Sequence, residues 1–375
     1  MRLVLGVAGI ELLAHVVILA LNPVLVEPIR RTRAFYRDQT AALNRFLDED
    51  RRGWSLDTLL GWQYREDRHL GPRGNYAPVA PAGRIRLGAF GNSFMRGADV
   101  SAAESWLEQV EARFPALETL NFGAAGYGND QSLLRYRRDG RGYHPSLVLI
   151  GLAPDNFRRN LNVYRRFLTP QGPPLSKPAY VVDARDSLRL IPNPLRTEAD
   201  LARLRDDPAS ARAMGRYDAW YEPLVFENPL HDWSATVRLA VAAWTRARRT
   251  WDPEHAIQRG GRYLPQSRAY RVTRALLLEF AATVRADGAT PVIIILPDQG
   301  MIGELRRGRP HPFAALRADF ERAGIAVLDL SDALIEAGPI DSLFTQGLHY
   351  TPAGSTVIAE WVGPRLLQLA GAPAR

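Results

Sequence analysis

Short apolar runs recur through the chain from residue 85 onward, and glycine, proline, aspartate or serine follows each of them closely. The runs are Ile85–Phe90, Leu117–Phe122, Leu147–Leu152, Pro291–Leu296 and Ile325–Leu330. Short apolar runs bounded by turn-forming residues are typical of strands buried on both faces of a parallel sheet.

Segments with helical periodicity lie between these runs. They span Glu104–Arg113, Asp130–Arg138, Val272–Ala286 and Pro312–Ala323. Strands that alternate with helices predict a doubly wound α/β fold, in which helices cover both faces of a parallel sheet.

The interval from Phe157 to Tyr270 interrupts this alternation. It contains a proline-rich stretch, a predicted hairpin over Tyr180–Ile191, a helical segment over Glu198–Met214 and a cluster of aromatic residues. We therefore predict an insertion between the third and fourth strands that packs over one rim of the sheet.

The N-terminus is strongly apolar. From Leu3 to Leu21 the only strongly polar side chains are Glu11 and His15, and the apolar character resumes up to Val26. A helix of this length spans roughly 30 Å of hydrocarbon. The alternatives are a cleaved signal peptide and a hydrophobic helix docked on the domain. Because the positive region before the apolar stretch is very short and no clear cleavage site follows, the sequence predicts an uncleaved transmembrane anchor.

The chain is predicted to have three parts. They are an anchor at residues 1–28, a connecting region at 29–83 with an amphipathic helix near Thr40–Phe46, and an α/β domain at 84–375 with its insertion at about 157–270. Glu11 is costly in lipid and marks a contact with a partner helix, unless it lies near water or is protonated. Arginines after the anchor favour a cytoplasmic domain by the positive-inside rule, although long domains translocate despite flanking charge.

Composition removes several kinds of chemistry. The 375 residues include no cysteine, so disulfides, thiolate metal sites and thiol catalysis are excluded. The formal net charge of +8 would suit nucleic acid. However, the arginines are scattered in doublets and we find no recognisable nucleic-acid module, so nucleic acid is not a predicted partner.

The first candidate for chemistry follows the first predicted strand. Gly91–Gly97 places Ser93 one turn past the strand, at the carboxyl edge where open α/β sheets bind their ligands. A serine at such a helix N-terminus can be an exposed nucleophile whose N–H also binds an oxyanion. The alternative is a serine that only caps the helix.

The second and third strands end in segments of a similar kind. Asn121–Asp130 contains three glycines, which let the backbone approach a ligand closely. Its spacing is not that of the dinucleotide fingerprint, so no cofactor is predicted. Gly151–Asn156 places an acid and an amide at the end of the third strand.

A histidine follows the fifth strand. His349 lies directly before an apolar helix, with Thr351 as its expected cap and Pro352 in its first turn. A lone histidine is more often structural than catalytic, but the loop after the fifth strand brings this one to the same edge as Ser93. No pair of histidines has metal-ligand spacing, so no metal site is predicted.

These four segments, in this order, resemble the SGNH (GDSL-like) hydrolase superfamily, and the resemblance extends from about Ile85 to Leu369. Gly91-Asn92-Ser93-Phe94 is similar to the serine block of the family, and Pro154-Asp155-Asn156 to its third block. Gly126 falls on the oxyanion glycine and His349 on the catalytic histidine. The chain looks especially like membrane-anchored bacterial members.

The resemblance implies a flavodoxin-like three-layer α/β/α domain that hydrolyses or transfers acyl esters. Ser93 would be the nucleophile and His349 its base, and the oxyanion donors would be Ser93, Gly126 and Asn156. By family analogy, carbohydrate O-acetyl esters are the first substrates to try, and such substrates place the domain in the periplasm.

The sequence departs from the family pattern in three places. Asn92 replaces the aspartate before the serine, and the third block has the order Asp155-Asn156 instead of Asn-Asp. Either Asn156 donates from a shifted loop, or Asp155 takes that position and would repel an oxyanion.

The acid expected two or three residues before His349 is replaced by Gly347 and Gln346. Asp341 and Asp298 are the candidate replacements, since the first precedes the histidine and the second ends the fourth strand. Two functions follow: a membrane-anchored serine esterase or O-acyltransferase, or a non-catalytic SGNH-like subunit of a membrane assembly that lost the acid. The bilayer and a membrane-protein partner for the N-terminal helix are the expected associations.

Overall fold

A five-stranded parallel sheet forms the centre of the protein. The computed structural model describes residues 2–20, 39–48, 54–64, 76–169, 172–183, 187–252 and 254–371. Every predicted apolar run forms one strand, with ends within a residue of those expected. Across the sheet the order is β11 (Ala326–Asp329), β10 (Thr290–Ile295), β5 (Leu147–Leu152), β3 (Ile85–Phe90) and β4 (Leu117–Asn121). The first of these strands in the chain thus lies between the second and the third, which is the flavodoxin-like order.

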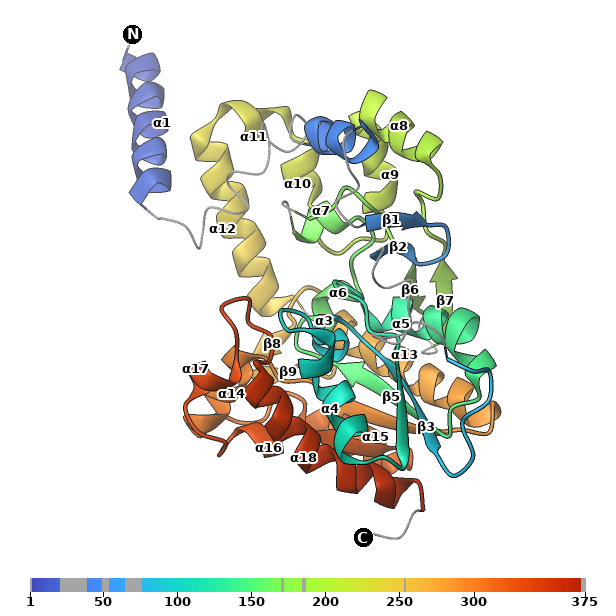
Figure 1. Ribbon diagram of the computed structural model, residues 1–375. Helices are drawn as coiled ribbons and strands as arrows, with labels where there is room; N and C mark the ends of the chain where they lie inside the picture. The colour runs from blue at the N-terminus through green and yellow to red at the C-terminus, as the bar shows by residue number, and fades with distance from the viewer. Residues whose placement is uncertain are drawn as a thin grey trace.

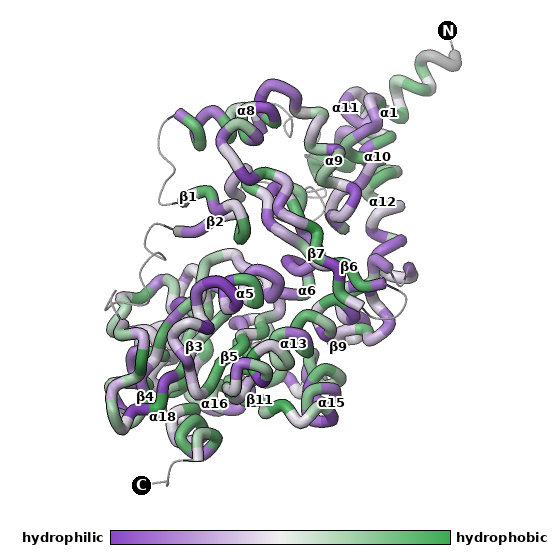
Figure 2. The backbone as a smooth tube through the Cα atoms, turned by 90° about the vertical axis from the view of Figure 1, so that its right-hand side faces the viewer, coloured by the Kyte–Doolittle hydropathy of each residue, from purple (hydrophilic) through white to green (hydrophobic). Residues whose placement is uncertain are grey.

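Alternate side chains of each strand face opposite sides of the sheet, and helices cover both sides. Leu149 and Ile294 face a cluster that includes residues of three helices: α4 (Trp106–Arg113), α16 (Ser331–Leu334) and α18 (Pro352–Leu369). Ile150 and Ile293 face a second cluster with residues of α5 (Asn129–Arg135), α13 (Arg268–Ala286) and α15 (Ala314–Arg322). Figure 2 shows hydrophobic colouring along β5. The predicted doubly wound parallel sheet is therefore confirmed.

The interval between β5 and β10 holds many short elements. In Figure 1 most of them lie in the upper part of the molecule, beyond α3 (Ser93–Arg96). The α-helices that precede α13 in this interval are α6 (Asn156–Arg159), α7 (Arg165–Leu168), α8 (Glu198–Asp206), α9 (Ala211–Gly215), α10 (Pro223–Phe226), α11 (Pro229–Trp233) and α12 (Ala235–Trp251). The strands are β6 (Ala179–Val182), β7 (Leu188–Ile191), β8 (Gln258–Arg259) and β9 (Arg262–Tyr263), and the β6–β7 pair is the predicted hairpin. The single helix predicted over Glu198–Met214 is divided into α8 and α9.

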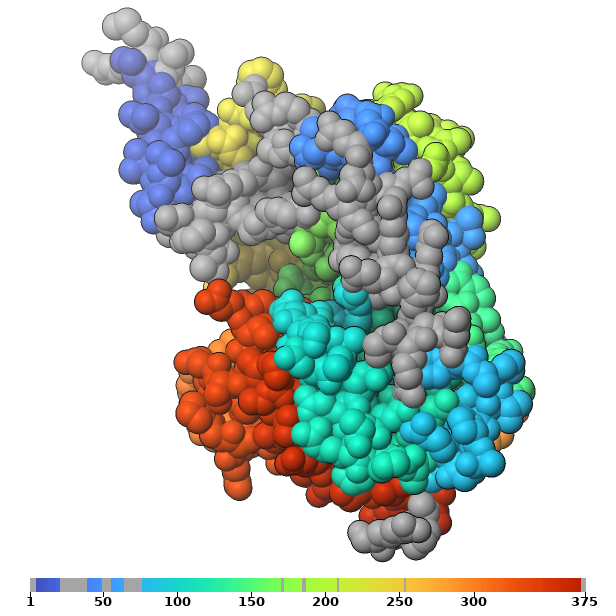
Figure 3. All heavy atoms as spheres, viewed as in Figure 1, coloured from blue at the N-terminus to red at the C-terminus, as the bar shows by residue number. Residues whose placement is uncertain are grey.

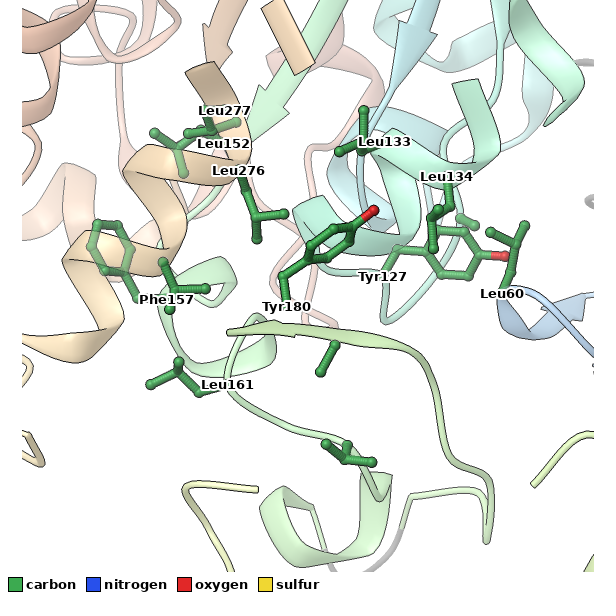
Figure 4. Close-up of a cluster of buried hydrophobic side chains, with 14 of the residues drawn as sticks. Leu60, Tyr127, Leu133, Leu134, Leu152, Phe157, Leu161, Tyr180, Leu276 and Leu277 are labelled. Atoms are coloured by element: carbon green, nitrogen blue, oxygen red, sulfur yellow. The ribbon is translucent and has the colours of Figure 1, made fainter. Parts of the chain in front are cut away.

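One buried cluster joins these parts (Figure 4). It includes Leu60 from the N-terminal region, Leu133 of α5, Leu152 of β5, Tyr180 of β6 and Leu276 of α13. Residues 39–48 form a helix where an amphipathic one was predicted, and β1 (Trp54–Asp57) pairs with β2 (Gly61–Tyr64). Because apolar side chains from all these segments share one core, the elements outside the sheet are fixed relative to it.

Two buried polar groups hold the interval in place, of which one joins it to the sheet domain and the other joins segments within the interval. Lys177 donates to the carboxylate of Asp130 in α5, and both side chains are almost fully buried. Asp218 accepts hydrogen bonds from the backbone N–H groups of Val163 at 2.7 Å, Tyr164 at 2.9 Å and Trp220 at 2.9 Å. Burial raises the pKa of Asp218 to about 6, although these hydrogen bonds act in the opposite direction.

The N-terminal helix corrects one prediction. Helix α1 (Arg2–Ala20) packs against α12, and Glu11 accepts hydrogen bonds from Ser234, Thr236 and the N–H of Ala235 at the start of α12. Slight burial raises the pKa of Glu11, but these hydrogen bonds outweigh it and lower the pKa to about 2.

No helix among the described residues has the length and apolarity needed to cross a bilayer. The predicted transmembrane anchor, with the membrane localisation that depended on it, is therefore wrong. Glu11, expected to be a costly charge in lipid, instead caps a helix of the same chain. The arginines used for the orientation, in residues 21–38, lie outside the described residues.

Candidate active site

Ser93 is the first residue of α3, which begins three residues after the end of β3, an interior strand of the sheet. The side chain of Asn92 accepts a hydrogen bond from the N–H of Phe94 at 3.0 Å, so Asn92 caps this short helix. Asn121, at the end of β4, donates to the carbonyls of Met95 and Arg96 and holds the helix from the other side. Asn92, before the serine, thus has a structural role in this turn.

His349 reaches Ser93 from the opposite end of the chain. Its Nε2 lies 2.8 Å from Ser93 Oγ, and its ring packs against that of Phe94 with the ring centres 4.9 Å apart. In Figure 3 the red C-terminal segments lie against the cyan segments that carry α3 and α4, and α18 packs on α4. The structure therefore brings together the serine and the histidine that the sequence singled out.

The acid beside His349 is Asp99, which the sequence did not single out. Asp99 Oδ2 lies 2.7 Å from His349 Nδ1 and accepts a hydrogen bond from Thr345 Oγ1 at 2.9 Å. Burial raises the pKa of Asp99, but the hydrogen bonds from His349 and Thr345 outweigh it and leave the pKa below its usual value. An ionised Asp99 accepts a hydrogen bond from the N–H at Nδ1, which leaves Nε2 unprotonated and able to accept a hydrogen bond from the Ser93 hydroxyl.

Asp298 and Asp341, the acids we expected here, have other partners. Asp298 caps α14 (Gln299–Arg306) by accepting from the N–H of Met301 at 2.7 Å. Asp341, in α17 (Ile340–Leu343), accepts from the side chain of Gln299 at 3.2 Å. Neither replaces the missing acid, because Asp99 already occupies the Nδ1 side of the ring.

Local geometry explains how Asp99 reaches the histidine. Helix α3 ends after one turn at Gly97, and Asp99 has a positive φ of 70°, a conformation rare for a residue with a side chain. Leu348, next to the histidine, also has a positive φ of 71°. A Cβ at Gly347 would overlap the Asp99 carboxylate, so the glycine at this position makes room for the acid. The only sequence signal for Asp99 was its place in the loop after Ser93.

The segments expected to hold an oxyanion lie next to one another. The N–H of Ala124 donates to the carbonyl of Gly91 at 3.0 Å, which joins the glycine-rich loop to the serine segment. Gly126 in this loop has a φ of 78°. Asn156 is buried, and its Nδ2 donates to the carbonyl of Tyr127 at 3.3 Å.

Asp155 is directed elsewhere. Its side chain is 56% exposed and pairs with Arg159 at 2.8 Å. Of the two alternatives left by the reversed third block, the structure thus favours Asn156 as the group beside the glycine-rich loop.

The N-terminal hairpin covers this loop. Trp62 of β2 is buried and donates from Nε1 to the carbonyl of Ala125 at 3.3 Å, while Tyr127 donates its hydroxyl to the carbonyl of Trp62 at 2.7 Å. The region predicted only to connect therefore helps to position the loop that contains Gly126.

The protein has a parallel α/β sheet, and a serine, a histidine and an aspartate form one hydrogen-bonded series at its carboxyl edge. These features define the class of α/β proteins with a serine-hydrolase type of site. More particularly, the structure is similar to solved structures of GDSL proteins. Neither a protein-family model nor a curated protein matches the chain.

Three of the similar structures illustrate the level of likeness. A GDSL-like lipase from Bacteroides thetaiotaomicron is 12% identical, with a TM-score of 0.35, and the match covers 77% of this chain and 93% of that one. A member of the lipolytic protein G-D-S-L family from Veillonella parvula is 13% identical, with a TM-score of 0.34, covering 74% and 96%. A lipase/acylhydrolase from Enterococcus faecalis is 13% identical, with a TM-score of 0.35, covering 75% and 96%. Identities this low carry no information on substrate, so the functional proposal depends on the geometry of the site.

Proposed function

We propose that this protein is a serine esterase or O-acyltransferase of the SGNH type that acts on acyl esters, with acetyl esters of carbohydrates as the first class to test. One observation carries the proposal, namely the continuous series from Ser93 Oγ to His349 Nε2 at 2.8 Å and from His349 Nδ1 to Asp99 Oδ2 at 2.7 Å. Both distances lie within the hydrogen-bonding range that proton transfer needs.

The proposed reaction begins with the attack of Ser93 Oγ on the ester carbonyl carbon. His349 Nε2 takes the hydroxyl proton, and the resulting imidazolium is stabilised by the Asp99 carboxylate. The tetrahedral intermediate then collapses, the C–O bond to the alcohol breaks, and His349 returns the proton to the leaving oxygen. Water or a second alcohol, deprotonated by the same nitrogen, releases the acyl group from Ser93.

The developing oxyanion needs hydrogen-bond donors. The N–H of Ser93, the N–H of Gly126 and the Asn156 amide are the proposed donors, and each is expected to contribute about 3 kcal/mol to stabilising the transition state. The contact between Asn156 and the carbonyl of Tyr127 supports this assignment because it brings the amide next to Gly126.

The alternative function, a non-catalytic subunit, depended mainly on the acid missing before His349. Asp99 supplies a carboxylate from another loop, so that departure from the family pattern no longer favours a loss of activity.

Labelling with a fluorophosphonate probe and turnover of p-nitrophenyl acetate test the proposal. We expect the wild-type protein to be labelled and active, Ser93→Ala to be neither, and Ser342→Ala, an exposed serine of α17, to behave like the wild type. Labelling that persists in Ser93→Ala would remove the nucleophile assignment. An unlabelled wild-type protein, beside a control esterase that is labelled, would remove the proposed function.

A further inference from the structure

A cavity of about 520 Å³ opens at the carboxyl edge of the sheet, beyond β5 and β10. Its walls come from three parts of the chain: Pro154 after β5, the β8–β9 hairpin with Gln258 and Tyr263, and the α14 segment that begins at Asp298. The volume lies within the range of roughly 300–1,000 Å³ that is usual for small-molecule pockets. The interval between β5 and β10 thus supplies one wall of a pocket.

Neither Ser93 nor His349 lines the cavity, but residues close in the chain to His349 and Asn156 contact its walls. Pro154 lies two residues before Asn156, and its carbonyl accepts the hydroxyl of Tyr263 at 3.0 Å. On the other side, Tyr350 follows His349 and donates its hydroxyl at 3.0 Å to the carbonyl of Pro297, the residue before Asp298. Since β5 pairs with β3 and with β10, the cavity opens at the same edge of the sheet as the reacting serine.

Asp298 gives the cavity its polar character. Glu304, which also lines it, is paired with Arg307 and lies 3.6 Å from Arg309. Among the described residues, Asp298 has no basic side chain within salt-bridge distance, and its carboxylate accepts hydrogen bonds only from backbone N–H groups at the start of α14, those of Met301 and Gly300. Burial raises the pKa of Asp298, which is what a partly desolvated carboxylate without a counter-ion shows.

The walls limit what can bind. An alkyl chain would fit the proline, leucine and methionine side chains but would leave the Asp298 carboxylate desolvated without a donor. An anion would be repelled by Asp298 and Glu304. An ammonium group would be attracted by Asp298 but repelled by Arg309, which lines the same pocket. A neutral ring with several hydroxyl groups fits both the polar and the apolar parts of the lining. Its O–H groups can donate to Asp298 and Gln258, and its C–H faces can pack on Pro154 and Leu305.

We propose that this cavity binds the alcohol half of the ester, a neutral hydroxyl-rich ring such as a sugar, and that Asp298 is a specificity-determining residue that accepts hydrogen bonds from its hydroxyls. This inference rests on the proposed esterase or acyltransferase function. It assigns to the cavity the part of the substrate that leaves with a proton from His349.

The test compares two acetyl esters that differ only in the alcohol, 6-O-acetylglucose and hexyl acetate. The wild type is expected to prefer the sugar ester in kcat/KM. Asp298→Asn should reduce that preference about tenfold, because a neutral amide replaces a charged acceptor. Asparagine caps a helix as well as aspartate does, so α14 is retained. Asp206→Asn, on the surface of α8, is the matched control and should keep the preference of the wild type.

A preference that is unchanged in Asp298→Asn overturns the inference, and so does a wild type that prefers hexyl acetate or acetylcholine. A binding measurement separates this failure from failure of the proposed function. Calorimetric titration of Ser93→Ala with 6-O-acetylglucose should show binding that Asp298→Asn weakens about tenfold. If the wild type hydrolyses p-nitrophenyl acetate but this binding is absent, the pocket assignment fails while the esterase proposal stands.

Discussion

The Asp99 carboxylate is the group whose role the structure makes most directly testable. Asp99→Asn keeps the size of the side chain and removes its charge. In the wild type the carboxylate accepts a hydrogen bond from the Nδ1–H of His349 at 2.7 Å, and the histidine becomes a cation when it takes the proton of Ser93. The substitution therefore acts on the charged intermediate more than on the resting protein.

The size of the effect follows from the charges and their exposure. Two unit charges about 4 Å apart attract each other by about 1 kcal/mol in water and about 4 kcal/mol at the effective dielectric constant of a protein surface. The side chain of Asp99 is 36% exposed and that of His349 is 20% exposed, so solvent screens part of the attraction. We expect a loss of about 2 kcal/mol, or roughly thirtyfold in kcat.

The assay is the pH dependence of kcat and kcat/KM for p-nitrophenyl acetate. Because the pKa of Asp99 is lowered, the carboxylate stays ionised well into the acid range, so the deficit of Asp99→Asn should persist wherever the wild type is active. Asp341→Asn, the same change in a side chain that contacts Gln299, should stay within about twofold of the wild type. Adding Gln346→Asp to Asp99→Asn should restore part of the activity, since it introduces a carboxylate three residues before His349.

A result of equal kcat for Asp99→Asn and the wild type at every pH would refute the reasoning. It would mean that the histidine is oriented and stabilised without a charge, as an acid-free pair with Ser93. A severe loss in Asp341→Asn would equally count against the assignment of Asp99.

Two further predictions concern packing and stability. Gly347→Ala should displace the Asp99 carboxylate and lower kcat about tenfold or more, whereas Gly142→Ala, where an added Cβ meets no atom within 4 Å, should not; equal rates for the two variants would contradict the geometry. Asp218, with its pKa raised to about 6, binds a proton in the folded protein at pH values where the unfolded chain has lost it. The unfolding free energy of the wild type relative to Asp218→Asn should therefore fall by about 3 kcal/mol as the pH rises from about 4 to about 6, and then stay constant. Urea unfolding of both proteins across this range measures the difference, and a difference independent of pH would contradict the prediction.

The sequence by itself determined the sheet and the two ends of the candidate site. A buried parallel strand needs an apolar run that is short and bounded by turn residues. This local pattern identified each strand of the parallel sheet, with its ends placed to within one residue. Because parallel strands all end at the same edge, Ser93 after the first strand and His349 after the last were placed together by topology alone.

Only the tertiary structure decided which acid completes the site and where the N-terminal helix lies. Asp99 and His349 are 250 residues apart, and their contact depends on two positive φ values and on the space left by Gly347. Similarly, an apolar helix with one glutamate has the same sequence pattern whether it lies in lipid or docks on its own chain. The contact between Glu11 and the start of α12 distinguishes the two, because a carboxylate is stabilised by the unpaired N–H groups of a helix end, and those groups come from residues more than 220 positions away.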